Sequence, residues 1–319
     1  MKIVQQNMKE TVSHIKFKLS TLMLNQKTPF DLFIKKDKNF LIIIEKGTLI
    51  SQKTLSLLQK QTALFIKKED QNKQTLSYTN LHAYLQSNLE LKEVTMSFLY
   101  QVLEKQFLQM FKYEKVFIDM NFVNSFVSNI VFLIQSDTEY LKNTIEYFSN
   151  DYNISIHSLH ISIYAIHIAN QLHLDKTKIQ EIGVAGLLHD IGIHQIDQKI
   201  LYKSTQLTKA EEHIVQEHPK LSVTILKHNQ IHNPYILDAV MHHHERYDGT
   251  GYPNQLHEKQ ISEYASILAI CDVFDALTNN RPYREKYSSF EALQMMIKDP
   301  KMQNNFNRKY LRVFLKSLT

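Results

Sequence analysis

The scarcity of glycine and proline constrains this chain more than any other feature of its sequence. Only six glycines and six prolines occur in 319 residues, and folds built on many tight turns use more of both. Apolar residues make up 43% of the chain, which is enough for an ordinary packed core. We therefore expect a mainly α-helical protein, and its length favours two domains.

The N-terminal region is the exception, because short apolar runs bounded by polar or turn residues occur there. Three of these runs predict β-strands: PFDLFIKK (29–36), NFLIIIEKG (39–47) and TALFIKKED (62–70). SQKTLSLLQKQ (51–61) has helical spacing, with Ser51 at the N-cap position. SYTNLHAYLQSN (77–88) predicts a further helix. We expect a small α/β domain over residues 1–92.

From residue 93 onward, apolar residues recur every three or four positions, as they do in amphipathic helices. The segments 93–111, 123–135 and 138–149 show this period, and we expect connecting helices over 93–150. A second, all-helical domain is expected over 151–319.

Charge and cysteine content narrow the class of protein. The net charge of +5 suits an anionic ligand, but the lysines are dispersed as on a solvated surface, so we expect no DNA partner. The single cysteine, Cys271, excludes an internal disulfide and favours a reducing compartment. The N-terminus lacks an apolar signal core, and the apolar runs fall short of the ~20 residues of a membrane span. We expect a cytoplasmic protein with no membrane span.

Histidine dominates the chemistry of the second half. The chain has 16 histidines, and those in IHSLH, LLHDIG, EHPKLS and HHHERYDGTGYP stand in helical segments with nearby carboxylates. The candidate ligands are His157, His189, Asp190, His218, His243, His244 and Asp272. Imidazole and carboxylate suit Fe, Mn or Zn. Asp272 lies in the apolar run AICDVFDAL, where a carboxylate is costly to bury unless it is paired or bound to metal.

Seven such ligands exceed the needs of one metal ion, whereas two metals that share Asp190 would use them all. Paired metals hydrolyse phosphate esters by lowering the pKa of a water from about 15.7 toward ~7 and by offsetting phosphoryl charge. Each remaining histidine, taken alone, is more readily explained as a satisfied core residue than as a ligand. These histidines are His160, His167, His173, His194, His213, His228, His232, His242 and His257.

The motifs HDIG, HHERYDGTGYP and CDVFDALTNNRPYR, in this order, resemble those of the HD-GYP domain, a subgroup of the HD phosphohydrolases, over about 155–317. The resemblance implies an all-helical domain with two or three metal ions, commonly including iron. It implies a cyclic di-GMP phosphodiesterase that releases linear pGpG and often GMP. Residues 1–92 are similar, through PFDLFIK and KGTLIS, to a small α/β domain that precedes HD-GYP domains; a sensor, a dimerisation platform and a lid all remain open.

Carried over residue by residue, the resemblance implies the same seven ligands, with Asp190 as the bridging and catalytic residue. We expect two divalent ions, with iron first and manganese or zinc as alternatives. Gly251 and Tyr252 would lie in a substrate-binding loop beside the site, and Arg281 and Arg284 would face the substrate phosphates. Homodimers and partner cyclic di-GMP synthases (GGDEF proteins) follow by analogy alone.

Other positions leave alternatives open. Glu245 either supports a ligand or lies on a helix surface. Ile193 stands where the family has a lysine, and losing one preorganised donor costs about 10² to 10³ in rate, unless His194 takes its place. Asn153 replaces the glutamate of the three-metal subgroup, which favours two metals. QLHEKQIS (255–262) and FNR (306–308) also depart from the family's pattern and indicate altered loops at the site mouth.

Two alternative functions to a cyclic di-GMP phosphodiesterase therefore remain open. One is a weak or inactive member that binds a cyclic dinucleotide and signals. The other is a phosphohydrolase for a different nucleotide.

Overall fold

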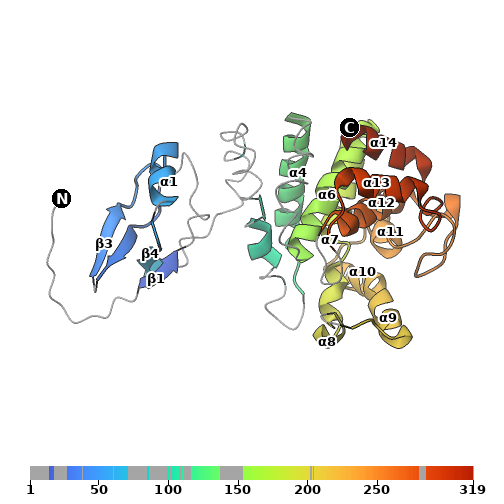
Figure 1. Ribbon diagram of the computed structural model, residues 1–319, viewed down its shortest axis with the longest axis horizontal. Helices are drawn as coiled ribbons and strands as arrows, with labels where there is room; N and C mark the ends of the chain where they lie inside the picture. The colour runs from blue at the N-terminus through green and yellow to red at the C-terminus, as the bar shows by residue number, and fades with distance from the viewer. Residues whose placement is uncertain are drawn as a thin grey trace. The chain divides into compact units, whose positions relative to one another are not determined.

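The computed structural model divides the chain into two compact units, residues 1–88 and 89–319 (Figure 1). The structure describes residues 14–17, 27–37, 39–59, 61–70, 85, 99–100, 102–107, 110, 116–136, 154–201, 203, 205–279 and 285–318. None of the helices within these ranges is long and apolar enough to cross a membrane.

The first unit is a four-stranded antiparallel sheet with one helix. Its elements are β1 (His14–Phe17), β2 (Leu32–Lys36), β3 (Asn39–Ile44), α1 (Gln52–Gln59) and β4 (Leu64–Lys67). The strand order is β1-β4-β2-β3. The three predicted strands and the helix are confirmed, and Ser51 Oγ accepts a hydrogen bond from the Thr54 amide at 3.1 Å. β1 was not predicted, although polar and apolar residues alternate over HIKFKL (14–19), a pattern that indicates a strand.

The core of this unit lies along one side of the sheet. Leu64 and Ile66 of β4 are buried, while Phe65 and Lys67 between and after them are partly exposed, as strand alternation requires. The buried apolar side chains that pack together here are Phe17, Phe30, Leu32, Ile50, Leu58, Leu64 and Ile66.

The second unit is helical in its described residues, which confirms the mainly α prediction. Its longer helices are α4 (Met120–Ser136), α6 (Ile154–Gln171), α7 (Lys176–Leu188), α10 (His218–His228), α12 (Glu263–Thr278), α13 (Ser289–Lys298) and α14 (Arg308–Leu318). Shorter elements are η4 (Ile191–Gln195), α8 (Gln198–Leu201), α9 (Lys209–Gln216), α11 (Pro234–His242) and η5 (Glu258–Gln260).

Helix α6 is the centre of this unit. Every residue from Ser155 to Ala169 is buried, because α4, α7, α12 and α14 pack around it (Figure 1). A helix whose apolar residues are spread around its whole circumference is buried in this way. The contact with α7 is close, since a Cβ atom at Gly186 would lie 3.0 Å from the Ser162 backbone.

The predicted connecting helices fall partly within the described residues. The segment 93–111 is helical wherever it is described, and 123–135 lies within α4, which packs against α6 and α7. Segment 138–149 and all but residue 85 of segment 77–88 lie outside the described residues. The domain boundaries at 92 and 150 stay predictions.

Candidate metal centre

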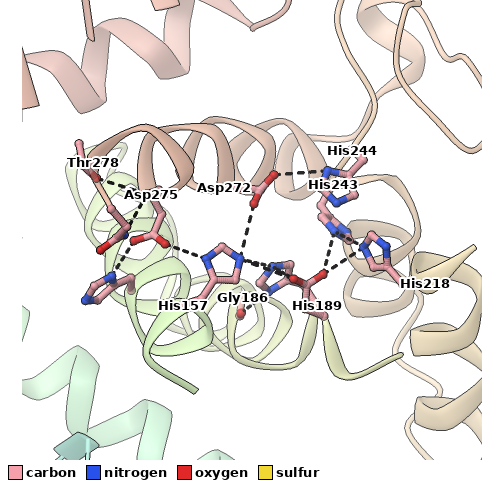
Figure 2. A network of polar contacts seen from close by, with 12 residues as sticks. His157, Gly186, His189, His218, His243, His244, Asp272, Asp275 and Thr278 are labelled. Carbon is pink, nitrogen blue, oxygen red and sulfur yellow. Dashed lines mark hydrogen bonds and ion pairs between the residues drawn. The ribbon is translucent and has the colours of Figure 1, made fainter. Parts of the chain in front are cut away.

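Seven side chains from distant parts of the sequence converge at the ends of four helices and the middle of a fifth (Figure 2). His157 lies in α6, and Asp272 lies in α12. His189 caps the end of α7 and His243 caps the end of α11. The other three lie just after a helix or at the start of one. Asp190 follows α7, His218 begins α10, and His244 follows α11. All except the half-buried His244 are buried.

The ligand atoms fall into two groups, and within each group all atoms lie within 4.8 Å of one another. The first group is His157, His189 and Asp272, and the second is Asp190, His218, His243 and His244. Of the histidines that the sequence analysis set aside, none joins either group in the part of the chain that the structure describes.

Asp190 faces both groups. Its Oδ2 atom lies 3.6 Å from His157 Nε2 and 3.4 Å from His189 Nε2. Its Oδ1 atom lies 3.1 Å from His218 Nε2 and 3.5 Å from His243 Nε2. One carboxylate oxygen is therefore directed to each group, as a bridging ligand requires.

Asp272 also spans the two groups, which the sequence analysis did not foresee. Its Oδ1 atom lies 3.5 Å from His157 Nε2, and its Oδ2 atom lies 3.3 Å from His244 Nδ1 (Figure 2). The two carboxylates thus occupy the space between the histidines of one group and those of the other.

Helix ends set the orientation of three of the histidines. The last carbonyls of a helix have no partner within it, so an imidazole just beyond the end can donate to one. The contacts are His189 Nδ1 with Gly186 O at 2.8 Å, His218 Nδ1 with Val215 O at 2.7 Å, and His243 Nδ1 with Val240 O at 2.8 Å. A carbonyl only accepts, so each Nδ1 carries the proton and each Nε2 directs a lone pair at the centre.

The spacing of these lone pairs fits metal ions. The Nε2 atoms of His157 and His189 lie 3.1 Å apart, and those of His218 and His243 lie 3.3 Å apart. Facing lone pairs repel each other unless a cation lies between them. Two imidazole nitrogens bound to one metal at about 2.0–2.1 Å lie about 2.8–3.4 Å apart for bond angles near about 90–110°. Each pair therefore fits one shared cation.

A second carboxylate on α12, Asp275, was missed by the sequence analysis. Its Oδ2 atom lies 2.7 Å from His157 Nδ1, and its Oδ1 atom lies 2.6 Å from His160 Nδ1. The available signal was its position three residues after Asp272, one turn further along the same helix face. The contact with His157 holds that ring so that Nε2 faces the cluster, and the contact with His160 gives a partner to Nδ1 of this buried core residue.

Electrostatics favour the protonation states that bind metal at four of the seven ligands. Burial opposes a charge on Asp190, yet the facing rings of His189 and His218 hold the pKa of its carboxyl well below the usual range. The pKa of Asp272 is lowered in the same way, against the effect of burial, by His244 and His157. Burial lowers the pKa of His243 and of His244. Ionised carboxylates and neutral imidazoles are the forms that coordinate metal. At His157 and His218 burial lowers the pKa, but nearby carboxylates outweigh it: Asp275 raises the pKa of His157 to about 9, and Asp190 raises that of His218.

The residues after His244 form the loop that the sequence analysis placed beside the site. A Cβ atom at Gly251 would lie 2.3–2.5 Å from the backbone of residues 244–246, so this loop lies directly against the end of α11. The ring centroid of Tyr252 is 4.7 Å from that of His244. Glu245 is 1% exposed, so the alternative prediction, that it lies on a helix surface, is wrong.

The structure describes only some of the other residues to which the sequence analysis assigned a role. Arg281, Arg284 and Asn153 lie outside the described residues. Ile193 is half-buried in η4, and His194 beside it is exposed.

Comparison with known proteins agrees with this arrangement. A profile of the HD domain matches residues 135–304. The chain belongs to the HD domain family. The expected HD-GYP resemblance is confirmed, and family membership implies divalent metal binding, for which the described residues contain a suitable cluster.

Two curated relatives carry names that describe an activity. Cyclic di-GMP phosphodiesterase PA4108 of Pseudomonas aeruginosa is 39% identical over 150 residues, which cover 47% of this chain and 36% of that protein. Cyclic di-GMP phosphodiesterase response regulator RpfG of Xanthomonas campestris is 38% identical over 128 residues, covering 39% and 33%. The chain spans about a third of the length of these relatives.

A solved structure matches nearly the whole chain. Bd1817, an HD-GYP-type protein from Bdellovibrio bacteriovorus, has a TM-score of 0.63 and 18% identity, covering 96% of this chain and 99% of that chain. At this identity the likeness shows a shared fold.

Proposed function

We propose that this protein is a metal-dependent phosphodiesterase that hydrolyses a 3′–5′ linkage of cyclic di-GMP to give pGpG, with GMP as an alternative end product. The observation that supports this best is Asp190, whose two oxygens face two separate groups of ligand atoms. Two adjacent sites of this kind suit phosphodiester hydrolysis. The activities named for the relatives point to cyclic di-GMP as the substrate.

We assign the first metal to His157, His189 and Asp272, the second to His218, His243 and His244, and Asp190 to both. Two bound divalent ions would supply a hydroxide near neutral pH and offset the charge of the phosphoryl oxygens. Iron is the first choice, with manganese and zinc as alternatives, and Asn153 favours two ions over three.

The side chains around the ligands have separate tasks in this proposal. Asp275 keeps the His157 ring oriented through the 2.7 Å contact with Nδ1. Tyr252 and Gly251 form a wall of the site, and Arg281 and Arg284 hold the phosphates. The proposal also includes a cytoplasmic location, a homodimer and cyclic di-GMP synthases as partner proteins.

Ile193 supports a second candidate, a cyclic-dinucleotide receptor with little or no turnover. This side chain is half-buried three residues after Asp190 and supplies neither charge nor donor where the family has a lysine. The complete set of ligand atoms favours the enzyme, because a receptor gains little from two metals of the hydrolytic type.

The test is anaerobic purification, reconstitution with Fe(II) or Mn(II), and chromatography of cyclic di-GMP reactions. A His189→Ala, Asp190→Ala double variant removes a ligand of each group. The matched control replaces two exposed histidines, His213 and His228, by alanine. We expect linear product from the wild type and the control, and none from the ligand variant. Binding of intact nucleotide without product would favour the receptor, and neither binding nor product would indicate another nucleotide.

A further inference from the structure

We propose that Glu245 is a positioning residue that fixes the GYP loop (residues 249–256) and, through it, the Tyr252 ring that borders the substrate. The inference rests on the proposed function, because it concerns how the cyclic dinucleotide is held. It assigns Glu245 to the loop instead of to the metal ligands.

Both carboxylate oxygens of Glu245 accept hydrogen bonds from backbone amides of the GYP loop. Oε1 accepts from the Asn254 amide at 2.6 Å, and Oε2 accepts from the Leu256 amide at 3.0 Å. The side chain is 1% exposed, and a buried carboxylate is costly unless hydrogen bonds compensate it. Opening the loop would strip both bonds from this charge, so Glu245 holds the loop closed.

A second tether joins the same loop to α11. His242 Nε2 lies 3.0 Å from Asn254 Nδ2, and His242 Nδ1 lies 2.9 Å from Asp238 Oδ1. The amide nitrogen of Asn254 only donates, so His242 accepts through Nε2 and carries its proton on Nδ1, toward Asp238. The loop is thus tied to the helix that ends in the metal-ligand histidines.

These tethers place Tyr252 against the second group of ligands. The Tyr252 amide donates to the His244 carbonyl at 3.2 Å, and its ring centroid lies 4.7 Å from that of His244 and 6.3 Å from that of His218. Aromatic rings stack with nucleobases, and a ring fixed in advance loses less entropy on binding. Glu245 therefore preorganises a wall for a guanine-containing substrate.

This arrangement predicts an effect on KM more than on kcat. In Glu245→Gln, an amide nitrogen faces a backbone N–H, so one tether is lost while the metal ligands remain. We expect KM for cyclic di-GMP to rise about tenfold, the size of a lost base-stacking contact. The two metals per chain should be retained.

The experiment is a double-mutant cycle on the metal-loaded protein. Glu245→Gln, Tyr252→Ala and the double variant are compared with Glu258→Gln, which removes an exposed carboxylate just beyond the loop. If Glu245 acts through Tyr252, the double variant binds no worse than Tyr252→Ala alone. Asn254→Ala, which cuts the other tether at an exposed side chain, should raise KM in the same direction even if Glu245→Gln does not fold.

Two results would overturn the assignment. Additive effects in the cycle would show that Glu245 acts independently of Tyr252. Loss of metal in Glu245→Gln, with Tyr252→Ala fully loaded, would show that Glu245 serves the ligands. Hydrogen exchange of residues 249–256 tests the tether without turnover: Glu245→Gln should exchange faster, and Glu258→Gln should match the wild type. Unchanged exchange refutes the tether, whereas a wild type that does not hydrolyse cyclic di-GMP refutes only the proposed function.

Discussion

Replacing Asp275 by asparagine isolates the contribution of an outer carboxylate to metal binding. Asp275 is fully buried and bonds His157 Nδ1 at 2.7 Å and His160 Nδ1 at 2.6 Å. Burial opposes its charge, but the two histidines lower its pKa to about 2, so the side chain is ionised at neutral pH. Asparagine keeps the volume, removes the charge and retains one acceptor oxygen for two donors.

The size of the effect follows from the position of His157 in the first group of ligands. Without a charged acceptor at Nδ1, the ring is a weaker base and is less firmly oriented. Losing an outer partner of a ligand histidine typically lowers metal affinity about 10- to 100-fold, which corresponds to about 1.4–2.7 kcal/mol. We expect a loss in this range for the metal bound by the His157 group.

The assay titrates metal-free protein with Mn(II) against a competing chelator, with circular dichroism to verify folding. Thr278→Val is the matched control, since it removes a buried hydroxyl one turn further along α12 that donates to the Phe274 carbonyl. Wild-type affinity in Asp275→Asn, or an equal loss in Thr278→Val, would refute the reasoning.

Three further predictions concern stability. His167 is 2% exposed and neither ring nitrogen has a hydrogen-bond partner within the described residues; burial lowers its pKa to about 4. The unfolded state, with a pKa near about 6.5, binds the proton first, so stability falls by up to about 1.4 kcal/mol per unit as pH drops from about 6.5 to 4. His167→Leu should remove this contribution from the pH dependence of stability and raise the urea midpoint; a slope equal to that of the wild type contradicts the assignment. Gly192→Ala should cost about 1–3 kcal/mol in urea unfolding, because its Cβ would lie 2.4 Å from the Ser222 nitrogen. Metal removal by chelation should lower the Tm of the wild type and leave that of the His189→Ala, Asp190→Ala variant unchanged.

His167 shows the limit of predictions that are made from neighbouring residues in the sequence. His160 and His167 stand on the same buried helix, and both were expected to be satisfied core residues. His160 meets Asp275, whereas neither nitrogen of His167 meets a partner in the described part of the chain. Their neighbours in sequence are alike, and only the packing of α12 against α6 separates them.

The sequence by itself determined the helical class, most elements of the N-terminal sheet and the identity of the seven candidate ligands. These depend on features that lie within a few residues of each other, such as apolar period, turn residues and short motifs. β1 was overlooked, although HIKF alternates polar and apolar residues as a strand does.

Tertiary structure decided how the candidate ligands are grouped and what supports them. The contact between His157 and Asp275 joins residues 118 positions apart, and Asp272 spans both groups because α12 packs against both α6 and α11. The bonds of Glu245 to the GYP loop depend on how the chain turns back after α11. A motif specifies which side chains are present, whereas the direction of each lone pair depends on where helices end and how they pack.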